Sequence, residues 1–105
     1  MTEYKVYLLN VAEIELDEAY EWYNQQKAGL GYQLVGEVSR YLKMISENPF
    51  IFAVRYQNDF RFAALKVFPY LIAYWIEEKS QSVYVASIFH TSRNPLQFET
   101  LLPLR

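Results

Sequence analysis

Hydrophobic residues in the first part of the chain change from a two-residue spacing to a helical spacing. Residues 3–9, EYKVYLL, alternate between apolar and polar side chains and predict a short strand. Asn10, with Glu13 three residues later, has the pattern of a helix N-cap, and the helix is predicted over residues 11–27. Its buried stripe is expected to contain Ile14, Ala19, Trp22 and Tyr23.

A second helix is predicted after a turn that contains two glycines. The segment Ala28-Gly29-Leu30-Gly31 interrupts the helical pattern, and the pattern resumes over residues 32–47. This helix ends at Asn48-Pro49, because a residue before proline avoids the helical region. A connection this short predicts an antiparallel helical hairpin. The apolar stripe of the second helix is Leu34, Val38, Tyr41, Leu42 and Ile45.

After Pro49 the apolar residues follow the two-residue period of strands. Strands are predicted at residues 52–56, 60–67, 71–77 and 83–89, joined by short connections such as Glu78-Lys79-Ser80-Gln81-Ser82. Short polar connections favour antiparallel hairpins over crossovers. The order of elements predicts an α+β fold, in which a helical hairpin packs on one face of an antiparallel sheet of about four strands, with the N-terminal strand in addition. At 105 residues the chain fits a single domain, residues 1–105.

Composition excludes several classes of site. The chain has no cysteine and one histidine, so it has no disulfide, no thiolate metal site and no cysteine nucleophile. It has no glycine-rich phosphate loop, and we expect neither a metal nor a cofactor. The N-terminal sequence MTEYKVYLLN lacks the pattern of a signal peptide, and no apolar run approaches the roughly 18 residues of a membrane span. We therefore expect a cytoplasmic protein.

The charged residues are unevenly distributed. Residues 1–50 contain 4 Lys+Arg and 8 Asp+Glu, net −4, whereas residues 51–105 contain 6 and 4, net +2. A general affinity for nucleic acid is not indicated by the total of −2. Aromatic residues make up 18% of the chain, with 10 tyrosines, so some rings are expected to contact a partner protein while others fill the core.

The candidate chemistry lies in the strands and at their ends. Arginine and lysine side chains bind phosphate oxygens, and histidine transfers protons near neutral pH. The alternative is that the cations are ordinary exposed strand charges that protect sheet edges. Side-chain alternation places Arg61 and Lys66 on opposite faces of their predicted strand. The six candidate residues are Arg55, Arg61, Lys66, Tyr70, His90 and Arg93.

Four segments, in this order, resemble the RelE/ParE superfamily of bacterial type II toxins. They are DEAYEWYNQQKAGLG, ISENP, FPYLIAYWI and SIFHTSRNP, and together the resemblance covers almost the whole chain. The resemblance implies the α+β fold predicted above and a small toxin that a cognate antitoxin wraps and neutralises. The FPY strand and the H-x-x-R-x-P ending are its more specific parts, and they look more like ParE than RelE.

The superfamily contains two activities, and the resemblance implies different roles for the same residues in each. RelE-like members cut messenger RNA in the ribosome with basic residues on the sheet and a polar group near the C-terminus. In that case His90, Arg93 and Arg61 would be catalytic. ParE-like members poison DNA gyrase and have no established nuclease site. In either case the residues expected to bind a partner or nucleic acid are Arg55, Lys66 and Tyr70.

Two departures from the RelE pattern favour the ParE-like activity. RelE-like chains resemble one another in an arginine on the strand that here contains Leu71, and no tyrosine follows Arg93. We therefore predict a toxin that acts on DNA gyrase, and whether it is an enzyme depends on this activity: a ParE-like toxin would not be one, whereas a RelE-like toxin would be an endoribonuclease. The alternatives are a RelE-like ribosome-dependent mRNA endoribonuclease, in which His90 transfers a proton, and a non-toxic member of the fold.

The high aromatic content also predicts an uncovered apolar surface. Small domains bury a smaller fraction of their surface than large ones, so an antitoxin segment is expected to cover apolar residues that remain exposed. The expected location is the outer face of the helical hairpin or an open sheet edge, and without the antitoxin the chain would self-associate as a homodimer. The mildly basic C-terminal half predicts acidic residues in the partner.

Overall fold

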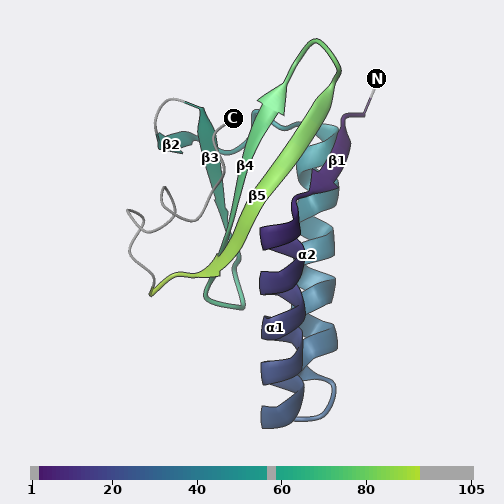
Figure 1. Ribbon diagram of the computed structural model, residues 1–105, viewed down its shortest axis with the longest axis vertical. Coiled ribbons are helices and arrows are strands. Elements are labelled where there is room, and N and C mark those ends of the chain that lie inside the picture. Colours follow the sequence, from purple (N-terminus) through teal and green to yellow (C-terminus); the bar gives the residue numbers. More distant parts are fainter. Residues whose placement is uncertain (1–2, 57–58, 93–105) are drawn as a thin grey trace.

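The chain folds into two helices on one face of a five-stranded sheet (Figure 1). The computed structural model describes residues 3–56 and 59–92. The two helices lie side by side as an antiparallel hairpin, whose turn extends beyond the end of the sheet. The elements are, in chain order, β1 (Lys5–Leu8), α1 (Asn10–Gln26), α2 (Leu30–Glu47), β2 (Val54–Tyr56), β3 (Phe60–Ala64), β4 (Tyr70–Glu77) and β5 (Ser82–His90).

The sheet has the strand order β1-β5-β4-β3-β2. Strands β2 to β5 pair antiparallel, which confirms the predicted α+β fold with a helical hairpin on an antiparallel sheet of about four strands. The N-terminal strand joins this sheet as a fifth strand, and it is parallel to β5, with Lys5 opposite Ser82 and Leu8 opposite Val85. The complete sheet is therefore mixed.

The turn between the helices depends on both of its glycines. Gly29 has a φ of 89°, in the left-handed region where a side chain would be strained. Gly31 is buried, and its N–H donates to the side-chain oxygen of Asn24 at 2.7 Å. A Cβ at position 31 would collide with the carbonyl oxygen of Tyr20. The missing side chain at Gly31 therefore lets the two helices approach closely, and the predicted helical hairpin is confirmed.

The first residue of α1 differs from the predicted cap. Asn10 is already helical, Leu9 precedes the helix, and no side chain forms a cap hydrogen bond there. The predicted N-cap role of Asn10 is therefore wrong. The N–H of Glu13 instead donates to the carbonyl oxygen of Leu9 at 3.0 Å, which is an ordinary helical bond. The predicted end of α2 at Asn48-Pro49 is confirmed, because the helix ends at Glu47.

The main core lies between the helices and the sheet. From α2 it contains Leu34, Val38 and Ile45, as the apolar stripe predicted. From α1 it contains the predicted Ala19 together with Ala12, and Leu16 and the predicted Tyr23 pack against them. Ile14 and Trp22 are 57% and 55% exposed, so their predicted burial is wrong. The sheet contributes Ala63, Ile72, Tyr74, Val83, Val85 and Ile88.

The opposite face of the sheet carries a second, smaller apolar cluster. Phe60, Ala73, Ala86 and Phe89 are buried there, with Trp75 packed against them. Among the described residues, neither helix is long and apolar enough to cross a membrane.

Candidate functional site

The start of β4 and the end of β5 bring two of the predicted site residues into contact. Tyr70 is paired with His90 in the sheet register. Their ring centroids are 5.3 Å apart and the rings are close to perpendicular, at 77°. The N–H of Thr91 donates to the carbonyl oxygen of Pro69 at 2.8 Å, so the pairing continues one step beyond the strands. Tyr70 and His90 thus form the centre of the candidate site.

The hydrogen bonds of His90 define the state of its ring. The backbone N–H of Ser92 donates to Nδ1 at 3.0 Å, and the hydroxyl of Ser92 lies 2.8 Å from the same nitrogen. A nitrogen that accepts from a backbone N–H carries no proton itself. The neutral ring therefore has its proton on Nε2, and that nitrogen is the one able to donate to a ligand.

A buried carboxylate fixes the loop between β3 and β4. Glu37 is 2% exposed, and its side chain accepts the backbone N–H groups of Lys66, Val67 and Phe68 at 3.1, 2.8 and 3.1 Å. These bonds explain why β3 ends at Ala64, whereas the sequence predicted a strand over residues 60–67. The backbone of the loop pairs with α2 rather than with a neighbouring strand. The Lys66 residue itself is exposed at this end of the sheet.

Arg61 lies elsewhere and is held by other contacts. Its Nη1 donates to the carbonyl oxygen of Phe52 at 2.6 Å, and its guanidinium carbon lies 5.2 Å from the ring centre of Phe50. In the sheet it is opposite Tyr74, four residues along β4 from Tyr70. At about 3.3 Å per residue this places it roughly 13 Å along the strand direction from the pair of Tyr70 and His90. The structure does not bring Arg61 and His90 together.

The structure does not describe the side chains of the two remaining predicted residues, Arg55 and Arg93. Arg55 lies in β2, where the structure describes its backbone, and Arg93 lies outside the described residues. Of the six predicted residues, Tyr70 and His90 are therefore in contact, and Lys66 lies on the loop that leads into Tyr70. Within residues 3–56 and 59–92, no group of three or more histidine, aspartate or glutamate side chains is arranged to hold a metal ion.

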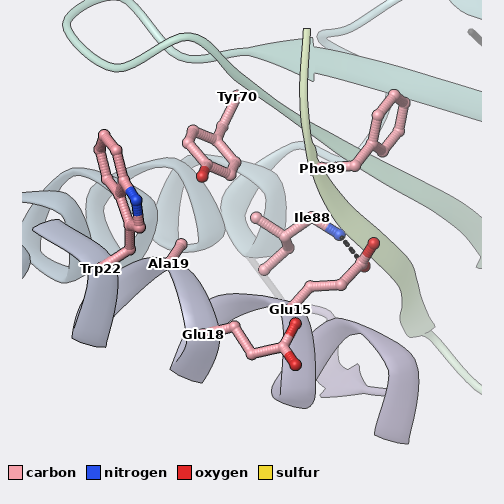
Figure 2. Close-up of a pocket in the computed structure, with 7 residues that line it drawn as sticks. All are labelled: Glu15, Glu18, Ala19, Trp22, Tyr70, Ile88 and Phe89. Atoms are coloured by element: carbon pink, nitrogen blue, oxygen red, sulfur yellow. Dashed lines mark hydrogen bonds between the residues drawn. The ribbon is translucent and has the colours of Figure 1, made fainter. Parts of the chain in front are cut away.

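A cavity of about 140 Å³ lies beside Tyr70, between α1 and β5 (Figure 2). Trp22 and Tyr70 form one side, and the carboxylates of Glu15 and Glu18 lie on the other side. Ala19 contributes only a methyl group to the lining, so the space between the larger side chains stays open. Ile88 and Phe89 complete the lining.

Glu15 also stabilises the edge of β5 next to this cavity. Strand β1 ends at Leu8, opposite Val85, so on this side β5 has no neighbouring strand beyond Val85 among the described residues. One oxygen of Glu15 accepts the N–H of Ile88 at 2.9 Å and the hydroxyl of Ser87 at 2.7 Å. The first turns of α1 therefore continue the hydrogen bonding that β1 begins. A β-bulge near Ala86, where the register to β4 shifts, lies in the same stretch.

Sequence reasoning missed the roles of two carboxylates. Glu37 is three residues after Leu34 and one before Val38, so it lies within the apolar stripe of α2. A carboxylate in such a position is a signal of a buried hydrogen-bonding role. Glu15 lies among the other carboxylates of the first helix, and its sequence environment carries no comparable signal.

Comparisons with known proteins agree with the observed fold and with the resemblance found in the four sequence segments. The family model described as the ParE toxin of the type II toxin–antitoxin system parDE matches residues 6–95. The chain belongs to this family. It is therefore a toxin of a type II toxin–antitoxin system, and the predicted membership of the RelE/ParE superfamily, closer to ParE, is confirmed. No curated protein sequence matches the chain at a significant level.

Several solved structures share the fold of this ParE-family toxin. The chromosomal ParDE system of P. aeruginosa superposes with a TM-score of 0.73 at 14% identity, covering 86% of this chain and 98% of the other. The isolated E. coli RelE toxin gives 0.67 at 19% identity, covering 93% and 95%. The RelBE2 toxin–antitoxin complex of Mycobacterium tuberculosis gives 0.63 at 15% identity, covering 89% and 97%. At these identities the likeness concerns the fold.

Proposed function

We propose that this toxin inhibits bacterial growth by binding DNA gyrase, as a ParE-like protein without nuclease activity, and that a cognate antitoxin neutralises it. The observation that carries the proposal is the separation of Arg61 from His90. Cleavage of RNA through its 2′-hydroxyl needs a proton acceptor and cations around the same phosphate. Here Arg61 donates to Phe52 and lies four residues along the sheet from the Tyr70–His90 pair.

The environment of Leu71 supports the same proposal. Its side chain is half-buried and packs against the apolar cluster on the outer face of the sheet, opposite Phe89 in the register. Strand β4, residues Tyr70–Glu77, contains no basic residue. A nuclease arginine from this strand is therefore replaced by an apolar contact. A surface of this kind suits recognition of a protein better than recognition of phosphate.

One observation favours the RelE-like alternative. Tyr70, His90 and the exposed Lys66 all lie at the same end of the sheet, and Nε2 of His90 carries the proton of the neutral ring. A proton donor beside a cation is a partial nuclease arrangement. In this alternative His90, Arg93 and Arg61 act on messenger RNA in the ribosome, and Arg55, Lys66 and Tyr70 bind it.

The antitoxin part of the proposal rests on the neighbours and on exposed apolar residues. The ParDE and RelBE2 structures are toxin–antitoxin systems by their descriptions. In this chain Ile14, Trp22, Tyr32, Ile51 and Val67 are all more than half exposed. We propose that an antitoxin segment covers part of this surface, and that the isolated toxin pairs through it as a homodimer. Size-exclusion chromatography with light scattering, with and without the product of the adjacent reading frame, tests both statements.

The target is tested by expressing the chain and measuring DNA breaks and messenger RNA cleavage in the same cells. The proposal expects DNA-damage signalling while translation continues, and inhibition of supercoiling when the purified toxin is added to purified gyrase. Immediate arrest of translation with cleaved messenger RNA and intact DNA would support the RelE-like alternative instead. Growth that is unaffected by strong expression would contradict both and identify a non-toxic member of the fold.

A further inference from the structure

The outer face of α1 combines two exposed apolar residues with a concentration of negative charge. Helix α1 contains five acidic residues and no basic residue. Between the exposed Ile14 and Trp22 lie Asp17, Glu18 and Glu21, and a shallow groove of about 340 Å³ follows the second half of this surface. Exposed aromatic and aliphatic side chains within a charged rim are typical of protein-binding surfaces.

The cavity beside Tyr70 opens on the same face (Figure 2). Its volume of about 140 Å³ is well below the roughly 300–1,000 Å³ of small-molecule pockets, so it suits one side chain of a partner. The indole of Trp22 lies across the cavity from Glu18, and Trp22 also contacts Tyr23 at 5.0 Å between ring centroids. Within residues 3–56 and 59–92, no basic side chain forms an ion pair with Glu18.

We infer that this cavity receives an arginine side chain from a partner protein. A guanidinium is planar, stacks on the face of an indole and donates to carboxylate oxygens at its edge. Trp22 provides the ring for stacking, and Glu18 provides the carboxylate at the opening. The carboxylate of Glu15 belongs to the same lining, where it accepts the N–H of Ile88.

Charge also decides the class of partner. The five carboxylates of α1 repel a phosphate backbone, so this face disfavours nucleic acid and favours a basic, partly apolar protein segment. The cavity adjoins the candidate site, because Tyr70 belongs to its lining and the ring centroid of Tyr70 lies 5.3 Å from that of His90. A segment anchored at Trp22 would therefore lie next to the Tyr70–His90 pair. The inference does not require gyrase to be the target.

The test uses two small probes that differ in charge and almost nothing else. N-acetyl-arginine amide carries the guanidinium, and N-acetyl-citrulline amide is its neutral counterpart of nearly the same shape. Each is titrated into the ¹⁵N-labelled chain while nuclear magnetic resonance follows the indole signals of Trp22 and Trp75. Trp75 is the internal control, because it stacks on Tyr84 outside the cavity.

We expect the arginine probe to shift the Trp22 indole and the backbone signals of Ala19 and Ile88 in a saturable way, with little effect on Trp75. Glu18→Gln should weaken this binding about three- to fivefold, as loss of a partly exposed charge pair does. Trp22→Leu should weaken it by a similar factor. Glu78→Gln, which makes the same charge change on an exposed turn far from α1, should leave it unchanged.

Three results would overturn the inference. They are equal shifts with arginine and citrulline probes, the absence of a saturable shift at Trp22, and an affinity that Glu18→Gln leaves unchanged. None of them depends on toxicity or on gyrase, so failure here is distinguishable from failure of the proposed function. The amide spectrum of each variant shows directly whether it is folded, so a loss of binding cannot be confused with unfolding.

Discussion

The carboxylate of Glu37, in the middle of α2, accepts the backbone N–H of Phe68 at 3.1 Å in the loop between β3 and β4. The neighbouring N–H groups of Lys66 and Val67 donate to the second oxygen of the same carboxylate. One side chain thus pairs three consecutive backbone donors that the sheet leaves without a strand partner. This loop leads directly into Tyr70, so Glu37 positions the candidate site from the opposite layer of the fold.

We predict that Glu37→Gln lowers the free energy of unfolding by about 2–3 kcal/mol, because an amide NH₂ replaces one oxygen and faces backbone donors that then lose their acceptor. Urea denaturation measures the change. Glu47→Gln is the matched control, since Glu47 is exposed on the same helix and pairs with Lys43 at 3.8 Å. It should change the unfolding free energy by less than about 0.5 kcal/mol. Equal effects of the two substitutions would show that the buried carboxylate has no special role.

The helix crossing gives a prediction about two glycines of α2. Gly31→Ala places a Cβ against the Tyr20 carbonyl and 2.8 Å from the Asn24 side chain, so the helices must separate. We expect a loss of about 1–3 kcal/mol in unfolding free energy. At Gly36 the nearest atom to an added Cβ is an Arg40 nitrogen at 3.9 Å. Gly36→Ala should therefore stabilise the chain by about 0.5–1 kcal/mol through helix propensity. Thermal unfolding of both variants checks the opposite signs.

Part of this arrangement was predictable from local pattern. The stripe of α2 was predicted correctly because Leu34, Val38 and Ile45 are strongly apolar and regularly spaced. The stripe of α1 was predicted only in part: Ala19 and Tyr23 face the core as expected, but the small Ala12 does so too, and the larger Ile14 and Trp22 remain outside. Size and hydrophobicity therefore indicated the wrong face for two of the four predicted residues. Small residues such as Ala12 and Ala19 allow α1 to lie close to β5. The pattern of one helix does not show how close the neighbouring strand lies.

The sequence pattern also could not predict which strands pair when they lie far apart in the chain. The strand Lys5–Leu8 was predicted, but its parallel partner β5 lies more than seventy residues later, and no turn residue specifies that register. The contact of Tyr70 and His90 was more accessible, because a β4–β5 hairpin was predicted and its register follows from the connection. The predicted placement of Arg61 and Lys66 on opposite faces of one strand does not apply, because β3 ends at Ala64 and Lys66 lies in the loop that follows.

The buried phenol of Tyr74 predicts a loss of stability in alkaline solution. Burial raises the pKa of Tyr74 to about 12, and the charge of Arg61 opposes part of that rise. The unfolded chain, with a pKa near 10, loses this proton first, so stability is fully present below pH 10 and is lost between pH 10 and 12. Allowing for relaxation around the phenolate, we expect a loss of about 1–2 kcal/mol.

Tyr74→Phe should reduce this slope of stability with pH. It should also cost about 1–2 kcal/mol at neutral pH, because the hydroxyl no longer donates to the carbonyl oxygen of Pro49, which is 2.7 Å away in the wild type. Some slope of the same sign should remain, since the pKa values of Tyr20 and Tyr23 are also raised, the first mainly by a hydrogen bond with Tyr32 and the second by burial. Urea denaturation at neutral pH and near pH 11 compares the two chains. An unchanged slope would contradict the assignment to Tyr74.

The last prediction separates a binding toxin from a nuclease at His90. His90→Phe keeps an aromatic ring against Tyr70 but removes both nitrogens, so the packing of the sheet end is retained while proton transfer is lost. If the toxin acts by binding gyrase, growth arrest and inhibition of supercoiling should remain within about twofold of the wild type. A nuclease that uses His90 should instead lose on the order of 10²–10⁴ in RNA cleavage and stop arresting growth. Tyr70→Phe serves as the control, because it changes the same contact without touching the imidazole. Arrest that disappears in His90→Phe but persists in Tyr70→Phe, in a chain whose unfolding free energy is unchanged, would replace the gyrase proposal with the ribonuclease.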